Sequence, residues 1–331
     1  MRAICATANR TLELRDVPKP EAPLPGHVTV KVDSATIMPG DKFFLTHAMP
    51  DGSMRGSKHG VYGANGAGTI IALGENVPDV FAGKKVGIYL SYAQTADTIG
   101  MWCEFAHVPY QSCLILPDHV RIRDFTGSFA NVLTVYSFLS QALDDGHKAV
   151  IITAGSSATG LIAASLTQTR NVPAIFLVRS PEARDKLLAH GVEHVLLTGE
   201  AGFGDCLEAL AAQLNATAVF DGVGSELLSR ILPRLPIEST VYIYGLVGGP
   251  TPTKVTAVDI ISRKLTLRHF SSLEMPTVTD IDRRAAALKH IGSLFDDPLF
   301  KTKIGREFPL EQFEEAIAYQ GKPGERAVLV A

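Results

Sequence analysis

Cysteine is scarce in this sequence, which has only four among 331 residues: Cys5, Cys103, Cys113 and Cys206. No two of them have the C-x-x-C spacing that is typical of zinc sites and redox pairs. So few scattered cysteines exclude a disulfide framework, and they also exclude a four-cysteine zinc site. We expect the four thiols to be buried or partly buried.

Long apolar runs and one-sided charge are also absent. No stretch approaches the ~18 consecutive apolar residues of a membrane-spanning helix, and the first residues alternate like a strand, without the apolar core of a signal peptide. Basic and acidic residues nearly balance, at 31 and 34, so no basic stripe favours nucleic acid. We expect a soluble, cytoplasmic protein that acts on a small molecule and binds neither nucleic acid nor a membrane.

The pattern of the sequence changes near Phe129. Before about residue 115, short alternating segments are separated by glycine and proline, as in a β-rich domain. After Phe129, strands alternate with helices that begin near Ala158, Pro181, Phe203 and Ser225, which implies a parallel sheet covered on both faces. The six expected strands are 149–154, 174–179, 194–197, 218–221, 241–246 and 265–270.

Two helical segments and a last strand, "RAVLVA", follow residue 270. We therefore predict an α/β protein of two domains. Residues 1–118 and 271–331 form the β-rich domain, and residues 119–270 form a doubly wound, six-stranded parallel sheet that is inserted into it.

The first strand of the parallel sheet leads into a glycine turn, Gly155-Ser156-Ser157-Ala158-Thr159-Gly160. Dinucleotide-binding turns usually read G-x-G-x-x-G, and the middle glycine is replaced here by Ser157. Serine still lets a phosphate approach the backbone, and the N-terminus of the next helix attracts an anion. An ordinary turn with capping serines is the alternative. The position on the first strand of the series favours a cofactor.

An acidic residue is missing at the end of the second strand. NAD sites usually have Asp or Glu there, about 20 residues after the turn, to bind the ribose 2′-hydroxyl. This chain has Arg179, Ser180 and, one helical turn later, Arg184. A guanidinium pairs well with a 2′-phosphate, so we predict NADPH as the cofactor. A solvated loop arginine is the alternative.

Several segments, in a specific order and spacing, carry a resemblance over nearly the whole chain. They include "GANGAGTIIALGENV", "AGSSATG", "VFDGVG", "YIYGLVGG" and "FPLEQFEEAI". The chain resembles the medium-chain dehydrogenase/reductase superfamily, in its zinc-independent quinone oxidoreductase branch. The resemblance implies a GroES-like N-terminal domain, a Rossmann domain that binds NADPH, and a homodimer held by the Rossmann domains. The expected cofactor contacts are the turn 155–160 with Thr134, Arg179, Ser180, Arg184, Val223, Gly245, Leu246 and Phe270.

Three departures from the family pattern bear on the chemistry. At the positions where members of the zinc-dependent branch have zinc ligands, this sequence has Pro39 and Ala64-Asn65, so we expect no bound metal. The asparagine of the I-N-P-x-D segment is replaced by Met38. The tyrosines of quinone reductases and enoyl thioester reductases fall on Phe43 and Met49, so that they cannot serve here.

Without zinc, no Lewis acid polarises a plain ketone. A conjugated acceptor needs less help, because one or two hydrogen-bond donors can hold the charge that develops on its oxygen. Our candidate donors are Asn65 and Tyr62. The alternative role of Asn65 is to brace its loop, and the alternative role of Tyr62 is to pack at the edge of the domain. Asp41 is expected to cap a loop, and His47 and His59 are more typical of surface histidines.

These observations predict a zinc-independent, NADPH-dependent reductase of quinones or α,β-unsaturated carbonyls. Two alternatives remain open. One is an enoyl thioester reductase. The other is a non-catalytic NADPH-binding protein of the same fold, in which the missing tyrosines reflect lost chemistry.

Overall fold

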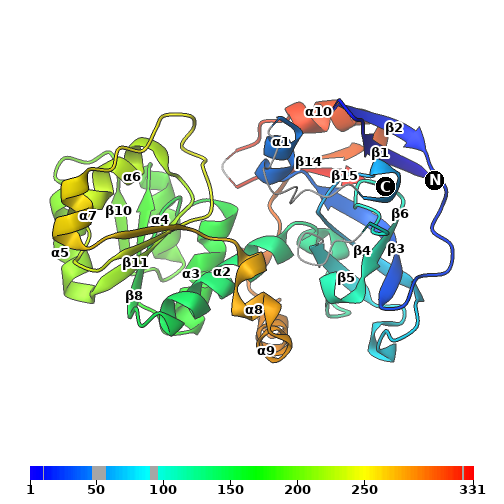
Figure 1. The fold of residues 1–331 in the computed structure, drawn as a ribbon, viewed down its shortest axis with the longest axis horizontal. Coiled ribbons are helices and arrows are strands. Elements are labelled where there is room, and N and C mark those ends of the chain that lie inside the picture. The colour runs from blue at the N-terminus through cyan, green and yellow to red at the C-terminus, as the bar shows by residue number, and fades with distance from the viewer. Residues whose placement is uncertain (10, 47–56, 90–95, 323) are drawn as a thin grey trace. The chain divides into compact units, whose positions relative to one another are not determined.

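The computed structural model describes residues 1–9, 11–46, 57–89, 96–322 and 324–331 (Figure 1). They form two compact units: unit 1 is Met1–Asn131 with Leu288–Ala331, and unit 2 is Val132–Ala287. The expected boundaries, after residues 118 and 270, lie earlier in the chain. Both observed boundaries fall inside helices, α2 (Ser128–Asp144) and α9 (Ile281–Gly292), and the first lies close to the change of sequence pattern at Phe129.

A seven-stranded sheet is the framework of unit 1. Its order is β14-β15-β3-β4-β5-β7, and β6 adds to β3. The strands are β3 (His27–Thr36), β4 (Asn65–Leu73), β5 (Lys85–Tyr89), β6 (Phe105–Pro109), β7 (Cys113–Ile115), β14 (Ile304–Pro309) and β15 (Arg326–Val330). A separate two-stranded sheet contains β1 (Arg2–Ala6) and β2 (Leu12–Asp16). The helices α1 (Pro39–Thr46) and α10 (Phe313–Ala318) complete the unit.

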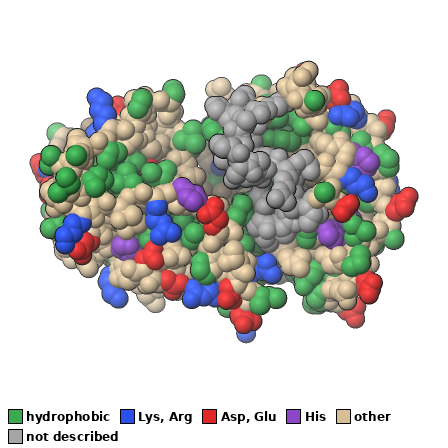
Figure 2. All heavy atoms as spheres, viewed as in Figure 1, with side chains coloured by type: hydrophobic (Ala, Val, Ile, Leu, Met, Phe, Trp, Pro, Cys, Tyr) green, Lys and Arg blue, Asp and Glu red, His purple; other side chains and the backbone are tan. Residues whose placement is uncertain are grey.

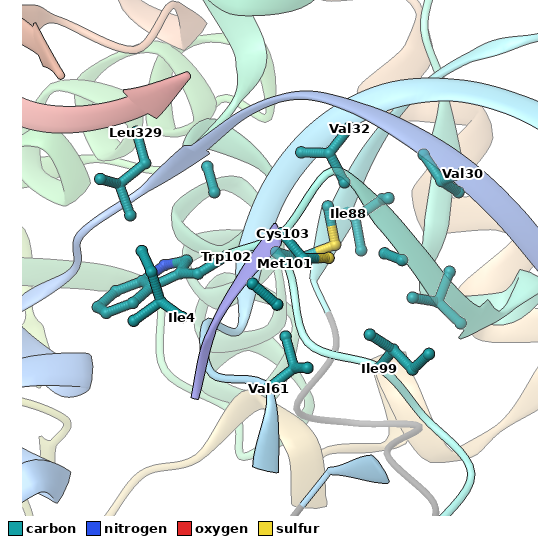
Figure 3. Close-up of a cluster of buried hydrophobic side chains, with 14 of the residues drawn as sticks. Ile4, Val30, Val32, Val61, Ile88, Ile99, Met101, Trp102, Cys103 and Leu329 are labelled. Carbon is teal, nitrogen blue, oxygen red and sulfur yellow. The ribbon is translucent and has the colours of Figure 1, made fainter. Parts of the chain in front are cut away.

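The core of unit 1 joins segments that are far apart in the sequence. Figure 3 shows Ile4, Trp102 and Leu329, from the two ends and the middle of the chain, among the side chains of this core. Trp102, the only tryptophan, is fully buried, and its indole N–H donates to the carbonyl of Thr36 at 3.4 Å. Burying a large apolar side chain stabilises a fold by roughly 1.5–3 kcal/mol. The last strand is therefore an integral part of this unit.

Unit 2 contains the parallel sheet, in the order β10-β9-β8-β11-β12-β13 that is typical of doubly wound dinucleotide-binding folds. The strands are β8 (Ala149–Ile152), β9 (Ala174–Val178), β10 (His194–Leu197), β11 (Ala216–Asp221), β12 (Thr240–Ile243) and β13 (Thr266–His269). All six predicted strands are present. Four of them end earlier than expected, because residues such as Ala154, with a φ of 51°, have already left the sheet for the loops at its carboxyl edge.

Helices cover this sheet, as every residue of β8 is buried. The helices of unit 2 are α3 (Ala158–Thr169), α4 (Pro181–Ala189), α5 (Phe203–Leu214), α6 (Ser225–Ile231), α7 (Ala257–Arg263) and α8 (Pro276–Thr279), together with most of α2. The four predicted helix starts are confirmed. Local chemistry sets two of them, since Ser157 and Ser180 cap α3 and α4 by accepting backbone N–H groups.

One expectation about the cysteines is wrong. Cys5, Cys103 and Cys113 are buried, whereas Cys206 is exposed. The buried stripe of α5 follows Phe203, Leu207 and Ala211 at four-residue spacing, and Cys206 lies off this stripe. Among the described helices, none combines the length and the apolar character needed to cross a membrane.

A buried histidine in unit 1 has both ring nitrogens engaged. In His107, Nδ1 lies 2.9 Å from the carbonyl oxygen of Asp97, and Nε2 lies 3.2 Å from the N–H of Leu24, which it can accept only while unprotonated. The ring also stacks on His27, with 4.8 Å between centroids. Burial lowers the pKa of His107, and the nearby His27 and Lys58 act in the same direction against Asp97.

This geometry predicts an acid-sensitive unit 1. An unfolded histidine titrates near pH 6.5 (roughly), so the stability that neutral His107 contributes is present above that pH and is lost as the pH falls. We expect the urea midpoint to fall from about pH 7.5 to about pH 5.5 more steeply in the wild type than in His107→Gln. Trp102 fluorescence measures it within this unit. The exposed His59 gives the control, His59→Gln, which should follow the wild type; parallel profiles for all three proteins would contradict the assignment.

Candidate functional site

The glycine turn lies between β8 and α3 in unit 2. A Cβ atom on Gly160 would approach the carbonyl oxygens of Ala154 and Gly155 to less than 3.0 Å. Helix α3 therefore packs so closely against the turn that only glycine fits at this position. The turn is also tied to the next strand, since the N–H of Gly155 donates to Leu177 at 3.0 Å. This is the close helix–strand packing that a dinucleotide-binding turn requires.

Ser157, at the position of the missing glycine, has ordinary extended backbone angles of φ −71° and ψ 168°. The conformation therefore needs no glycine. Its hydroxyl oxygen accepts the N–H of Gly160 at 3.1 Å, which is the capping role of the alternative interpretation. Capping uses only the acceptor side of the hydroxyl, so its hydrogen can still be donated to a phosphate oxygen.

Asp221 is a site residue that the sequence analysis missed. It ends β11 and is fully buried, and its carboxylate accepts the hydroxyl of Thr153 at 2.7 Å and the N–H of Gly224 at 2.8 Å. Burial raises the pKa of Asp221, while these bonds favour its ionised form. The network fixes the turn that presents Val223 at the carboxyl edge. The signal for it was an acidic residue directly before glycine in "VFDGVG".

Tyr244, which follows β12, was missed as well. Its ring stacks on Phe220 at 3.9 Å between centroids, and its hydroxyl is hydrogen-bonded to Thr159 in the first turn of α3. Burial raises the pKa of Tyr244, so the phenol stays neutral. The tyrosine thus links the end of β12 to the glycine turn. Next to it, the predicted cofactor residue Gly245 is partly exposed and Leu246 is 60% exposed.

Two predicted cofactor residues lie deeper in unit 2. Thr134 on α2 is half-buried, and its hydroxyl oxygen lies 3.3 Å from that of Ser272. Phe270 is buried against Phe138 and Phe220. The Phe270 side chain therefore belongs to the core of unit 2. The sequence analysis included Phe270 among the cofactor contacts because it ends the last expected strand.

The end of β9 carries the basic residues that favoured NADPH. Arg179 is exposed, and its side chain makes no ion pair within the part of the chain that the structure describes. Ser180 caps α4 by accepting the N–H of Ala183 at 3.2 Å. Arg184 lies near Asp185 and Glu200, at 3.2 and 3.7 Å. An unpaired guanidinium at this strand end, where no carboxylate follows Val178 directly, fits a 2′-phosphate.

The candidate acceptor residues lie on unit 1, around the buried Asp41. Its carboxylate accepts the N–H of Met38 at 2.8 Å and also that of Ala64, so it joins α1 to the segment before β4. This is the loop cap expected from the sequence. Burial raises the pKa of Asp41 to about 7, while the two backbone bonds act in the opposite direction.

Tyr62 is held in the same corner. Its hydroxyl donates to the backbone carbonyl of Asp41 at 2.9 Å, and its ring packs edge-on against Trp102 at 5.1 Å between centroids. Burial raises the pKa of Tyr62, with a smaller contribution from Asp41. Since the hydroxyl hydrogen is engaged by a carbonyl, the structure gives Tyr62 the contacts of a packed brace.

Asn65 is different, because part of its side chain is unsatisfied. It begins β4, opposite Tyr89 on β5, and is only 5% exposed. Its Oδ1 has no hydrogen-bond partner among the described residues. Leaving a buried polar group unpaired costs about 1–3 kcal/mol. Turning the amide by half a revolution would present the N–H₂ donors at the same place, so Asn65 can offer a ligand either hydrogen-bonding function.

The remaining candidates contribute little to this corner. His59 is exposed and has a positive φ of 61°, and Phe43 lies half-buried in α1. His47 and Met49 lie outside the described residues. Across the described ranges, no group of three or more His, Cys, Asp and Glu side chains could hold a metal ion.

Comparison with known proteins agrees with this geometry. Residues 24–118 match the family model of the alcohol dehydrogenase GroES-like domain. The chain is 27% identical over 261 residues to YhfP of Bacillus subtilis, whose name assigns it to the quinone oxidoreductases; the match covers 78% of this chain and 76% of YhfP. It is 25% identical over 284 residues to the acrylyl-CoA reductase AcuI of Ruegeria pomeroyi, covering 81% and 78%.

A solved structure extends the likeness to the whole chain. The quinone oxidoreductase of Escherichia coli, solved in complex with NADPH, superposes with a TM-score of 0.74 at 19% identity and covers 100% of both chains. A GroES-like unit combined with a doubly wound, dinucleotide-type unit defines the class of medium-chain dehydrogenases and reductases. Residues 24–118 carry the GroES-like domain of this class, and over most of its length the chain is similar to quinone oxidoreductases and to an acrylyl-CoA reductase.

Proposed function

We propose that this protein is a zinc-independent, NADPH-dependent reductase of quinones or α,β-unsaturated carbonyls. The observation that carries the proposal is the carboxyl edge of the sheet in unit 2. There helix α3 packs closely against the glycine turn at Gly160, and Arg179 stands unpaired where an NAD site would have a carboxylate. NADPH, when bound, supplies a hydride to the acceptor.

Residues of unit 2 would hold the cofactor. The N–H groups and the partial positive charge at the start of α3 favour the diphosphate, and the guanidinium of Arg179 favours the 2′-phosphate. Asp221 and Tyr244 position the loops around this edge through the contacts described above. The proposed contact residues are the turn 155–160, Thr134, Arg179, Ser180, Arg184, Val223, Gly245 and Leu246.

Asn65 on unit 1 would act on the acceptor. A donor fixed in a buried site stabilises charge that develops on a carbonyl or quinone oxygen better than water does. The unsatisfied amide of Asn65 is suited to this role. Tyr62 and Asp41 support the segment that carries Asn65. Because conjugation spreads the charge, no metal ion is required.

An enoyl thioester is the second candidate acceptor. It is supported by the similarity to AcuI, which is named as an acrylyl-CoA reductase. The thioester carbonyl would present the same kind of oxygen to Asn65, so the two reactions place the same demand on this residue.

A panel of acceptors tests the function. We expect the purified chain to oxidise NADPH in the presence of quinones, enals, enones or enoyl thioesters, and to keep its activity with a strong chelator. The relative rates select between the acceptor classes. Binding of NADPH without turnover of any acceptor would instead identify a non-catalytic NADPH-binding protein, and activity that is lost with the chelator would contradict zinc independence.

Arg179→Asp tests the choice of cofactor. The wild type should bind NADPH more tightly than NADH, because only NADPH carries the 2′-phosphate. In the variant the Kd for NADPH should rise on the order of 10- to 100-fold, since a charge-assisted pair is replaced by repulsion. The Kd for NADH should change little. Equal affinities of the wild type for both cofactors, measured by calorimetry, would overturn the assignment.

We also propose a cytoplasmic homodimer held by unit 2. Strand β13 is an edge strand of the sheet, and α7 exposes apolar side chains, with Val258 at 71% and Ile261 at 78%. Figure 2 shows hydrophobic side chains gathered over the end of unit 2 that carries α7. Exposed apolar clusters of this kind are typical of interfaces.

Light scattering on the eluting protein tests the dimer. We expect twice the chain mass for the wild type and the monomer mass for the double variant Val258→Glu and Ile261→Glu. Val80 is similarly exposed on unit 1, so Val80→Glu is the matched control and should remain dimeric. A monomeric wild type, or a dimeric double variant, would contradict the interface.

A further inference from the structure

The two arginines near the end of β9 are in different electrostatic surroundings. Arg179 makes no ion pair within the described ranges. Arg184 has two acidic neighbours: its Nε lies 3.2 Å from Asp185 Oδ1, and its Nη1 lies 3.7 Å from Glu200 Oε1. The Arg184 side chain is 35% exposed and that of Glu200 is 62% exposed, so solvent screens this ion pair and keeps it weak.

Glu200 reaches Arg184 because of the sheet order. Strands β9 and β10 are parallel neighbours, so their carboxyl ends lie at the same edge. The N–H of Thr198 donates to the carbonyl of Val178 at 2.9 Å, which fixes the chain after β10 beside the end of β9. A turn then follows, closed by the N–H of Glu200 donating to Leu197 at 3.2 Å. The backbone therefore holds Glu200 at the start of the α4 region.

We propose that Glu200 is a specificity-determining residue that weakens the preference for NADPH by holding Arg184. The inference rests on the proposed function. A 2′-phosphate at this edge would have to share Arg184 with the Glu200 carboxylate or displace it. NADH has no 2′-phosphate and does not compete for Arg184. The wild-type preference for NADPH is therefore carried mainly by Arg179.

Glu200→Gln removes the charge and keeps the size of the side chain. Exposed ion pairs are weak, so we expect the Kd for NADPH to fall about threefold, with a smaller change at high salt. The Kd for NADH should stay unchanged. Glu238 gives a matched control, because it pairs with Lys264 at 2.9 Å before the amino end of β12, the opposite edge of the sheet. Glu238→Gln should alter neither Kd.

Arg184→Ala completes the test, measured by calorimetry on the full chain. If Glu200 acts by holding Arg184, then Glu200→Gln should no longer tighten NADPH binding in the Arg184→Ala background. An equal gain in that background would overturn the proposal in favour of direct repulsion. An unchanged Kd for NADPH in Glu200→Gln, or an equal gain for NADH, would overturn it as well. A wild type that binds no NADPH would instead refute the proposed function itself.

Discussion

Replacing Asn65 with alanine is expected to lower kcat for the best acceptor on the order of 100-fold, the usual cost of removing one donor to a developing oxyanion. The Kd for NADPH should stay close to that of the wild type, because the proposed cofactor contacts lie on unit 2. Stopped-flow kinetics gives kcat, and calorimetry gives the Kd.

The orphaned Oδ1 separates this role from a structural one. Because Asn65 Oδ1 has no partner among the described residues, alanine should leave the urea midpoint of unit 1 unchanged or raise it. A bracing residue would behave differently. Tyr62→Phe removes a hydroxyl that donates to the carbonyl of Asp41, and it should lower the free energy of unfolding by about 1 kcal/mol and with it the urea midpoint. Wild-type turnover in Asn65→Ala would show that this residue does not hold the oxyanion.

Gly160→Ala is expected to damage both the cofactor site and the fold of unit 2. The new Cβ would meet two backbone oxygens, of Ala154 and Gly155, which cannot move aside as a flexible side chain can. We expect a loss of about 1–3 kcal/mol in the free energy of unfolding. The displaced helix start should raise the Kd for NADPH on the order of 100-fold, because its anion-binding N–H groups no longer face the turn.

Gly199 provides the control for this substitution, since a Cβ there would meet nothing within 4 Å. Gly199→Ala should therefore keep both the thermal midpoint and the Kd of the wild type. If Gly160→Ala also kept both, the turn would not be constrained as described.

The parts of the structure that depend on local chemistry could be predicted from the sequence. The start of α4 follows from Ser180 as a cap and Pro181 in the first turn, and the alternation of strands and helices gives the class of sheet. The first unit boundary lies close to Phe129, where the sequence pattern changes. The second boundary falls within α9, and no change of pattern marks it in the sequence.

The site divides in the same way. The turn motif predicts the role of Gly160, and Asn65 could be proposed because it occupies the position of a zinc ligand in the zinc-dependent branch. The pairing of Arg184 with Glu200 depends on β10 lying beside β9, and the contact of Tyr244 with Thr159 depends on the ends of β12 and α3 meeting. Such contacts join residues that are distant in sequence, so no local pattern indicates them.

The position of β15 has a consequence for the order in which the nascent chain can fold. Strand β15 lies between β14 and β3, and it pairs antiparallel with β3, which is roughly three hundred residues earlier in the chain. The sheet of unit 1 therefore stays incomplete until residues 326–330 have been synthesised. Unit 2 is one continuous segment and has all its strands long before that. During translation the early strands of unit 1 therefore wait with an unpaired edge, exposed to aggregation and to chaperones, while the inserted unit can already be folded.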